Sequence, residues 1–174
     1  MPIINDALLE PFMSPDTRRG VLVVLLIVVL LVLQAMTSAR ARALPPDAQL
    51  WSCNGRTDTL FGHAVRQAES RGLPRYLVAG VAWRESTWRV DAVNDNGAHR
   101  AEGVMQIVVH YHRSMKGWTF DPCASFSYGA DYLARLLRKY QGAVCMALGE
   151  YSGHTVGYCD DVLGYMQRVN RAAG

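Results

Sequence analysis

The sequence predicts a mainly α-helical domain, preceded by one N-terminal hydrophobic helix and interrupted by a short β-hairpin or loop region. Three patterns support this fold class. Residues 21–33 are an unbroken run of Val, Leu and Ile. Apolar residues then recur at helical spacing in several segments, whereas the polar, turn-rich run at residues 94–100 lacks that period. A chain of 174 residues is expected to form one globular domain after such a segment.

The N-terminal apolar run has two interpretations. Extended to residues 21–39, it is about as long as a helix that crosses a bilayer. A small-x-small pattern that ends at Ala43 instead fits a secretory signal that is removed on export. The preceding residues are numerous and acidic for a signal peptide, so we favour a single-pass anchor in the inner membrane. Residues 1–20 are then a cytoplasmic tail, and residues 40–50 link the anchor to a domain of residues 51–174.

All four cysteines of the chain follow the apolar run: Cys53, Cys123, Cys145 and Cys159. An even number of cysteines fits disulfide formation in an oxidising compartment, which places the domain in the periplasm. Four cysteines allow three pairings, and spacing alone does not select one. Our prediction pairs Cys145 with Cys159 and Cys53 with Cys123. The alternative is four free, buried thiols.

Helical spacing and helix-ending residues predict the order of the helices in the domain. They are expected at residues 58–71, 74–84, 125–140 and 143–151, with a last helix that begins near residue 160. Gly72 ends the first, and Pro74 suits the first position of the second. Asp160 and Asp161 suit the N-terminus of the last helix, where the helix dipole favours negative charge.

One glutamate extends the apolar face of the predicted helix at residues 74–84. Leu77, Val81 and Glu85 are spaced by four, so they share that face. Partial burial there raises the pKa of a carboxyl group, as a general acid working at neutral pH requires. Trp83 and Trp88 are candidates to wall the site and exclude water. The alternative is an ordinary surface ion pair between Glu85 and a neighbouring arginine.

A second block, residues 103–107, follows the turn-rich run. Asn96-Gly97 is a strong turn signal, so residues 87–105 are expected to hold a short hairpin beside the site. Gly103 permits a positive φ or a close backbone approach. The amide of Gln106 can donate and accept hydrogen bonds, as sugar hydroxyl and N-acetyl groups require. Ile107 is expected in the core.

These blocks together resemble a known family. Glu85-Ser86 followed by Gly103-Val104-Met105-Gln106-Ile107 resembles the paired signature of the soluble lytic transglycosylase (SLT) domain family, which belongs to the goose-type lysozyme-like superfamily. Asp121-Pro122, with the later Gly129, Tyr132 and Leu133, resembles a further family stretch. The run Ala147-Leu148-Gly149-Glu150-Tyr151-Ser152-Gly153 resembles a third. The resemblance covers about residues 58–171.

The resemblance implies a lysozyme-like fold and a mechanism with one carboxylate. Such enzymes cleave the β-1,4 bond between N-acetylmuramic acid and N-acetylglucosamine in peptidoglycan, and they form a 1,6-anhydro product without water. Glu85 would be the catalytic acid and then the base. Ser86, Met105, Gln106 and Tyr151 would bind or position the substrate, with Ser86 also orienting Glu85 and Tyr151 approaching Glu85 or the sugar's N-acetyl region.

Two alternatives remain open at this point. If Asp91, Asp95 or Glu102 faces Glu85, a hydrolytic lysozyme reaction on the same bond becomes possible. Ser152 replaces the usual Asn of the family, and residues 99–102 and 108–112 also depart from its pattern. These departures motivate a non-catalytic module that binds peptidoglycan or assists assembly.

The expected partners are peptidoglycan glycan strands and the inner membrane, through residues 21–39. A secretion or conjugation machine, or a bacteriophage, could use such an enzyme to open the wall locally. The net charge of +3 is scattered, which argues against nucleic acid. No cofactor or metal is expected, because no Gly-rich phosphate loop occurs and His110 and His112 lack further ligands at metal-site spacing.

Overall fold

The computed structural model describes residues 24–31, 49–97 and 99–173. The chain divides into two units, Met1–Arg42 and Ala43–Gly174. In the first unit residues 24–31 are helical, and their side chains are exposed. No helix within the described ranges is both long enough and apolar enough to cross a membrane. The predicted tail, most of the predicted anchor and most of the linker lie outside the described residues.

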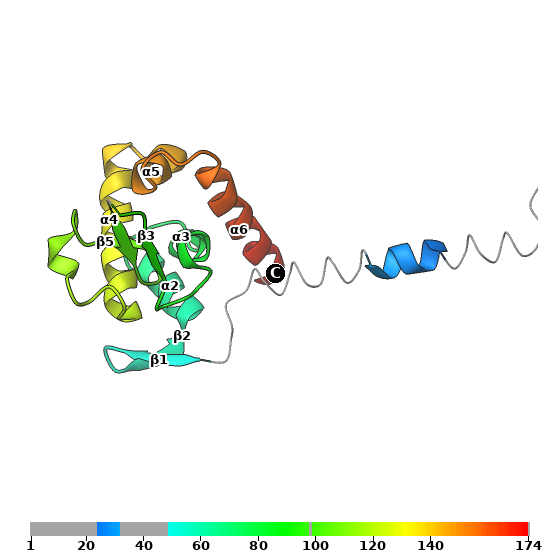
Figure 1. Ribbon diagram of the computed structural model, residues 1–174, viewed down its shortest axis with the longest axis horizontal. Helices are drawn as coiled ribbons and strands as arrows, with labels where there is room; N and C mark the ends of the chain where they lie inside the picture. Colours follow the sequence, from blue (N-terminus) through cyan, green and yellow to red (C-terminus); the bar gives the residue numbers. More distant parts are fainter. Residues whose placement is uncertain (1–23, 32–48, 98, 174) are drawn as a thin grey trace, which may run out of the picture. The chain divides into compact units, whose positions relative to one another are not determined.

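The described part of the second unit is mainly α-helical with small antiparallel sheets, as predicted (Figure 1). Its α-helices are α2 (Leu60–Glu69), α3 (Leu77–Ser86), α4 (Pro122–Lys139), α5 (Val144–Tyr151) and α6 (Tyr158–Ala173). Its strands are β1 (Leu50–Cys53), β2 (Arg56–Thr59), β3 (Val93–Asp95), β4 (Arg100–Glu102) and β5 (Ile107–Val108). A short 3-10 helix, η1, covers Arg113–Met115.

The β1–β2 hairpin was not predicted, although its turn carries a hairpin signal. Asn54 and Gly55 both have positive φ values, 52° and 76°, as the tight turns that join two strands require. The hairpin occupies the start of the first predicted helix, so α2 begins only at Leu60, after Thr59 caps it by accepting a hydrogen bond from the Gly62 N–H. The helix predicted near residues 58–71 is therefore present but begins two residues later than expected.

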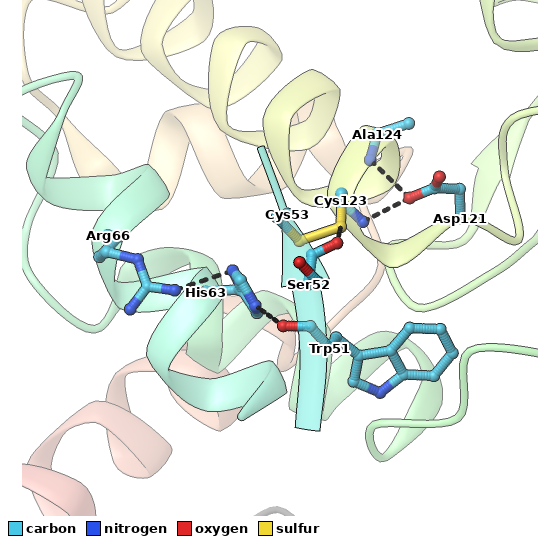
Figure 2. Close-up of a disulfide and its surroundings, with 8 residues drawn as sticks. All are labelled: Trp51, Ser52, Cys53, His63, Arg66, Asp121, Cys123 and Ala124. Carbon is cyan, nitrogen blue, oxygen red and sulfur yellow. Dashed lines mark hydrogen bonds between the residues drawn. A yellow bond between two sulfur atoms is a disulfide. The ribbon is translucent and has the colours of Figure 1, made fainter. Parts of the chain in front are cut away.

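Two disulfides cross-link elements of the domain. Cys53 of β1 bonds to Cys123 in the first turn of α4, as Figure 2 shows. Cys145 of α5 bonds to Cys159 of α6. Both pairs are those predicted.

Capping residues fix where the remaining helices begin. Asp121 caps α4 by accepting from the Cys123 and Ala124 N–H groups, and Pro122 occupies the first turn, so this helix begins three residues earlier than predicted. Asp160 and Asp161 lie in the first turn of α6, as predicted. Pro74 lies in a turn before α3 and not in its first position, because the Leu77 N–H closes a turn onto the Pro74 carbonyl.

Helix α3 is the central element of the core. Leu77, Val78 and Val81 are 1 % exposed or less. Gly80 lets α6 approach closely, because a Cβ at this position would lie 3.0 Å from a Val162 methyl group. The C-terminal end of α3 is thereby held against α6, and this end carries Glu85.

The region between α3 and α4 forms a three-stranded antiparallel sheet in the order β3-β4-β5, and not a single hairpin. Two glycines pack it tightly against its neighbours. Gly103 has φ +74°, and a Cβ there would collide with the Thr119 carbonyl. A Cβ at Gly129 of α4 would lie 2.5 Å from the Met105 methyl group. Residues 103–107 are therefore held between α4 and the end of α3.

Candidate active site

Glu85 lies in the last turn of α3, half-buried, and its carboxylate accepts one hydrogen bond from another helix. The Tyr158 hydroxyl, at the first residue of α6, donates to Glu85 Oε1 at 2.5 Å. Tyr158 is itself buried. The contact joins residues 73 positions apart in the chain. The close α3–α6 packing therefore places a phenol directly on the acid.

The surroundings of Glu85 favour its neutral form. Burial raises the pKa of Glu85 from 4.5 to about 7, and this effect exceeds the opposing effects of the Tyr158 hydrogen bond and the nearby Arg84 charge. The predicted upward shift of this pKa is thus present. A carboxyl group with this pKa exchanges a proton readily at neutral pH.

Arg84, the adjacent cation, does not form an ion pair with Glu85. Its Nε donates to Asp161 Oδ2 at 2.8 Å, and its guanidinium lies 5.5 Å from the centre of the Tyr158 ring. The alternative of an ordinary Glu85 ion pair with this neighbour is therefore wrong.

Ser86 joins the end of α3 to the residue 103–107 segment. Its buried hydroxyl lies 3.1 Å from the Ala82 carbonyl oxygen and 2.9 Å from that of Val104, and it can donate to either. The carbonyl of Gly103 accepts from the Gln106 side chain at 2.9 Å, and that of Ala92 accepts from the same amide at 3.2 Å. These bonds fix the backbone next to Glu85. Ser86 is buried away from solvent, so its role here is to position the segment.

Tyr151, at the end of α5, completes the surroundings of the acid. Its hydroxyl donates to the Met105 carbonyl at 3.0 Å. Burial raises the pKa of Tyr151 well above 10, and the Glu85 charge raises it further, so the two side chains lie within electrostatic reach. The Tyr151 hydroxyl therefore stays protonated at neutral pH beside the acid.

Two of the side chains expected at the site are buried in the core. The Met105 side chain is fully buried against Gly129, so it belongs to the core and only its backbone carbonyl meets Tyr151. Trp88 is 3 % exposed and also packs in the core, because the left-handed backbone at Thr87 and Trp88 turns the chain inward after α3. Trp83 is half-buried and stacks on Tyr165. Ile107 is buried, as expected.

The candidate second carboxylates are engaged elsewhere or exposed. Asp91 and Asp95 are exposed. Glu102 pairs with Arg100 at 2.7 Å and accepts from the Thr119 hydroxyl at 2.6 Å. Within the described residues, no second carboxylate is among the groups that shift the pKa of Glu85.

Ser152, which departs from the family pattern, forms its side-chain hydrogen bonds within a turn. Its hydroxyl donates to the Gly149 carbonyl at 3.2 Å and accepts from the Thr155 N–H at 3.2 Å. These bonds close the end of α5, and the Cys145–Cys159 disulfide links the helices on either side of this turn.

Tyr158 is the residue that sequence reasoning missed. The last helix was expected from Asp160, which left Tyr158 in a loop. The neighbouring Cys159 carried the available signal, because its predicted bond to Cys145 already brought this segment to the helix that ends at Tyr151.

The described structure also has candidate features away from Glu85. A cavity of about 430 Å³ lies between the end of α2, α4 and the start of α5, and Glu85 does not line it. Within residues 24–31, 49–97 and 99–173, no group of three or more metal-ligating side chains gathers. His110 is exposed, and His112 packs against Tyr128 and Tyr132.

Comparison with known families gives one match. The model of the transglycosylase SLT domain matches residues 63–155, which is more than half of the chain. Comparison with curated proteins and with solved structures gave no match. The matched range contains Glu85, Ser86, Gln106 and Tyr151, whereas Tyr158, the β1–β2 hairpin and two of the four cysteines lie outside it.

Proposed function

Because the chain belongs to the transglycosylase SLT domain family, whose members are lytic transglycosylases of peptidoglycan, we propose that Glu85 is the single acid and base of such a reaction. The bond cleaved is the β-1,4 bond between N-acetylmuramic acid and N-acetylglucosamine. The observation that carries the proposal is the partly buried carboxyl group of Glu85, which accepts a hydrogen bond from Tyr158 and whose pKa is raised by burial to about 7. The helical arrangement around it fits a lysozyme-like fold.

The first step requires protonated Glu85. Its proton passes to the glycosidic oxygen as the bond from that oxygen to the anomeric carbon breaks, and positive charge develops on the muramic acid ring. The resulting Glu85 carboxylate is stabilised by the hydrogen bond from Tyr158. Tyr158 thus offsets part of the cost of the charge that burial otherwise disfavours.

The second step returns the proton to Glu85. The carboxylate accepts the proton of the sugar's own 6-hydroxyl group while that oxygen bonds to the anomeric carbon. A 1,6-anhydro ring forms, no water is consumed, and Glu85 ends the cycle protonated. One carboxyl group therefore serves both steps, in contrast to the pair of carboxylates in most glycosidases.

Ser86, Gln106 and Tyr151 support this chemistry by fixing the backbone beside the acid. The Ser86 and Tyr151 hydroxyls bond to the carbonyls of Val104 and Met105, and the Gln106 side chain closes the same turn. A displacement of about 1 Å at such a site lowers the rate by as much as about 100-fold.

The products of peptidoglycan digestion test the proposal. The full-length chain and Glu85→Gln are incubated with peptidoglycan, and the released muropeptides are weighed by mass spectrometry. We expect anhydro products, each lighter by one water than a reducing-end sugar, and a loss of about 10²- to 10⁴-fold in rate for the variant. Glu69→Gln, which changes an exposed carboxylate paired with Arg75, serves as the matched control.

Other product patterns contradict the proposal in defined ways. If the wild type releases reducing-end products and Glu102→Gln or Asp91→Asn abolishes them, the enzyme is a hydrolase with two carboxylates. Equal wall binding by wild type and Glu85→Gln, with no product from either, would establish a binding module.

The location of the enzyme is part of the proposal. The apolar run at residues 21–39 supports an inner-membrane anchor, and the two disulfides in the following domain support a periplasmic site. Tethering would confine cleavage to wall close to the membrane, as local opening for a secretion or conjugation machine or for a phage requires. Membrane fractionation of full-length chain, with a search for cleavage near Ala43, distinguishes an anchor from a removed signal.

A further inference from the structure

A row of aromatic side chains extends from the candidate active site across α4. Tyr151 lies 5.6 Å from Tyr132, Tyr132 lies 5.2 Å from His112, and His112 lies 5.4 Å from Tyr128, all between ring centres. His112 Nδ1 and the Tyr128 hydroxyl form a hydrogen bond of 2.9 Å. All four residues are half-buried, so each keeps part of its surface in solvent. We call these four residues the aromatic row.

Arg135 lies beside the aromatic row and is held by two of its rings. Its guanidinium carbon is 5.4 Å from the centre of the Tyr132 ring and 6.0 Å from that of Tyr128. The side chain of Arg135 is exposed. Its charge also helps to lower the pKa of His112, after the larger effect of burial. The cation is therefore positioned by contacts to flat ring faces, which leave its N–H groups available to other partners.

The carboxylates on α4 and α5 are already paired with other residues. Asp131 accepts from Arg71 Nε at 2.6 Å. Glu150 accepts from Lys139 Nζ at 2.5 Å and also from the Tyr140 hydroxyl. Arg135 has no salt-bridge partner within the described residues. A planar cation with free donors beside the site is suited to a carboxylate of the substrate.

We propose that Arg135 binds a carboxylate of the peptide stem of peptidoglycan while the glycan lies along the aromatic row. This inference rests on the proposed function, because it assumes the same substrate. The partly exposed residues of the row suit contact with the apolar faces of sugar rings, and Arg135, which packs on Tyr128 and Tyr132, would meet the peptide stem of a glycan bound there. Arg135 therefore makes the enzyme prefer glycan strands that still carry their peptides.

Two substrates that differ only in their stems test this role. Peptidoglycan is used intact and after amidase treatment, which removes the stem carboxylates but leaves the lactyl carboxylate on each muramic acid. For Arg135→Ala, we expect kcat/KM on intact strands to fall about tenfold, mainly through KM, because a charged hydrogen bond is lost at an exposed site. On stripped strands we expect the variant to equal the wild type. Arg135→Lys should recover only part of the loss, since it keeps the charge without the fork.

Arg138→Ala is the matched control, because Arg138 is exposed on the same helix one turn later and touches no ring of the row. An equal loss from Arg135→Ala on both substrates, no loss on either, or the same loss from Arg138→Ala overturns the proposal. Binding of both substrates is also measured with Glu85→Gln and with Glu85→Gln plus Arg135→Ala. If the wild type releases no product, the proposed function is contradicted. The binding comparison still tests the role of Arg135, because it does not require turnover.

Discussion

Two polar clusters of the domain each lie next to a disulfide. They differ in whether a cation pairs with the carboxyl group of the cluster. At the N-terminal hairpin, Asp58 pairs with Arg66, and Arg66 donates to His63 Nδ1 at 2.8 Å. His63 in turn donates from Nε2 to the Trp51 carbonyl at 2.7 Å (Figure 2). At the end of α3, the Tyr158 hydroxyl is the only side-chain hydrogen-bond donor to Glu85 among the described residues, and the neighbouring Arg84 is bound to Asp161.

The pKa values of the two carboxyl groups reflect this difference. The Arg66 hydrogen bond lowers the pKa of Asp58 below its usual value, whereas burial raises that of Glu85 to about 7. A fully paired cluster contributes to folding and has little freedom to exchange a proton. A partly buried carboxyl group without a paired cation destabilises the fold when charged, and such a group is a candidate for proton transfer at neutral pH.

Removing the two disulfides one at a time should have the largest effects of the changes considered. Both removals should lower stability, but only one should lower activity. Cys53–Cys123 spans 70 positions and Cys145–Cys159 spans 14. The chain-entropy relation then gives a loss of about 4 kcal/mol for Cys53→Ser with Cys123→Ser and about 3 kcal/mol for Cys145→Ser with Cys159→Ser. Only the second pair flanks Tyr151 and Tyr158, so we expect only its removal to lower kcat/KM, by roughly tenfold.

Chemical denaturation and muropeptide release, both at a temperature where all variants are folded, measure the two effects. A greater loss of activity from the Cys53–Cys123 pair would mean that the hairpin takes part in catalysis, and the contrast between the clusters would fail.

Glu85→Gln should stabilise the domain above neutral pH. Below pH 4.5 the carboxyl group is protonated in both folded and unfolded states, so it has no effect on their difference. Between pH 4.5 and about 7 the unfolded state releases this proton and the folded state retains it, so wild-type stability falls as pH rises. The gain for the uncharged variant should reach about 3 kcal/mol above pH 7.

Asp58→Asn should change stability in the opposite direction to Glu85→Gln. Because its pKa is lowered on folding, Asp58 stabilises the domain above its unfolded pKa, and this contribution is lost as pH falls. Its variant should therefore be less stable than wild type at neutral pH and similar in strong acid. Urea midpoints from pH 2 to pH 8 decide both signs, and a Glu85→Gln variant that is less stable than wild type at pH 8 would contradict the account of the partly buried acid.

The sequence predicted the acid better than its partners. The spacing of Leu77, Val81 and Glu85 was sufficient to place a carboxyl group at the edge of the core, because a helix face is a local property. The bond from Tyr158 depends on how α3 and α6 pack, which no local pattern encodes. The burial of Met105 likewise depends on the absence of a side chain at Gly129, 24 positions away.

The hairpin shows a different kind of failure. Asn54-Gly55 carried a usable turn signal, but the apolar spacing that follows favoured a helix from residue 58, and the strands are only four residues each. Such short strands contribute too few residues for an alternating pattern to be recognised. The predicted Cys53–Cys123 bond indicated that this segment is attached to the domain, but it did not indicate the conformation.

Tyr158→Phe should have the smallest effect and should locate the acid in the pH profile. The Tyr158 hydroxyl lowers the pKa of Glu85 by stabilising its charged form, so its loss should raise that pKa by about one unit. The decline of kcat/KM on the alkaline side, near pH 7 in wild type, should move upward by the same amount, since the first step needs protonated Glu85. Tyr165→Phe is the control, because Tyr165 is buried on the same helix and stacks on Trp83. If both variants leave the pH profile unchanged, Tyr158 serves only as packing. The difference between the pKa of Asp58 and that of Glu85 is then explained by the Arg66 pair at one and burial at the other.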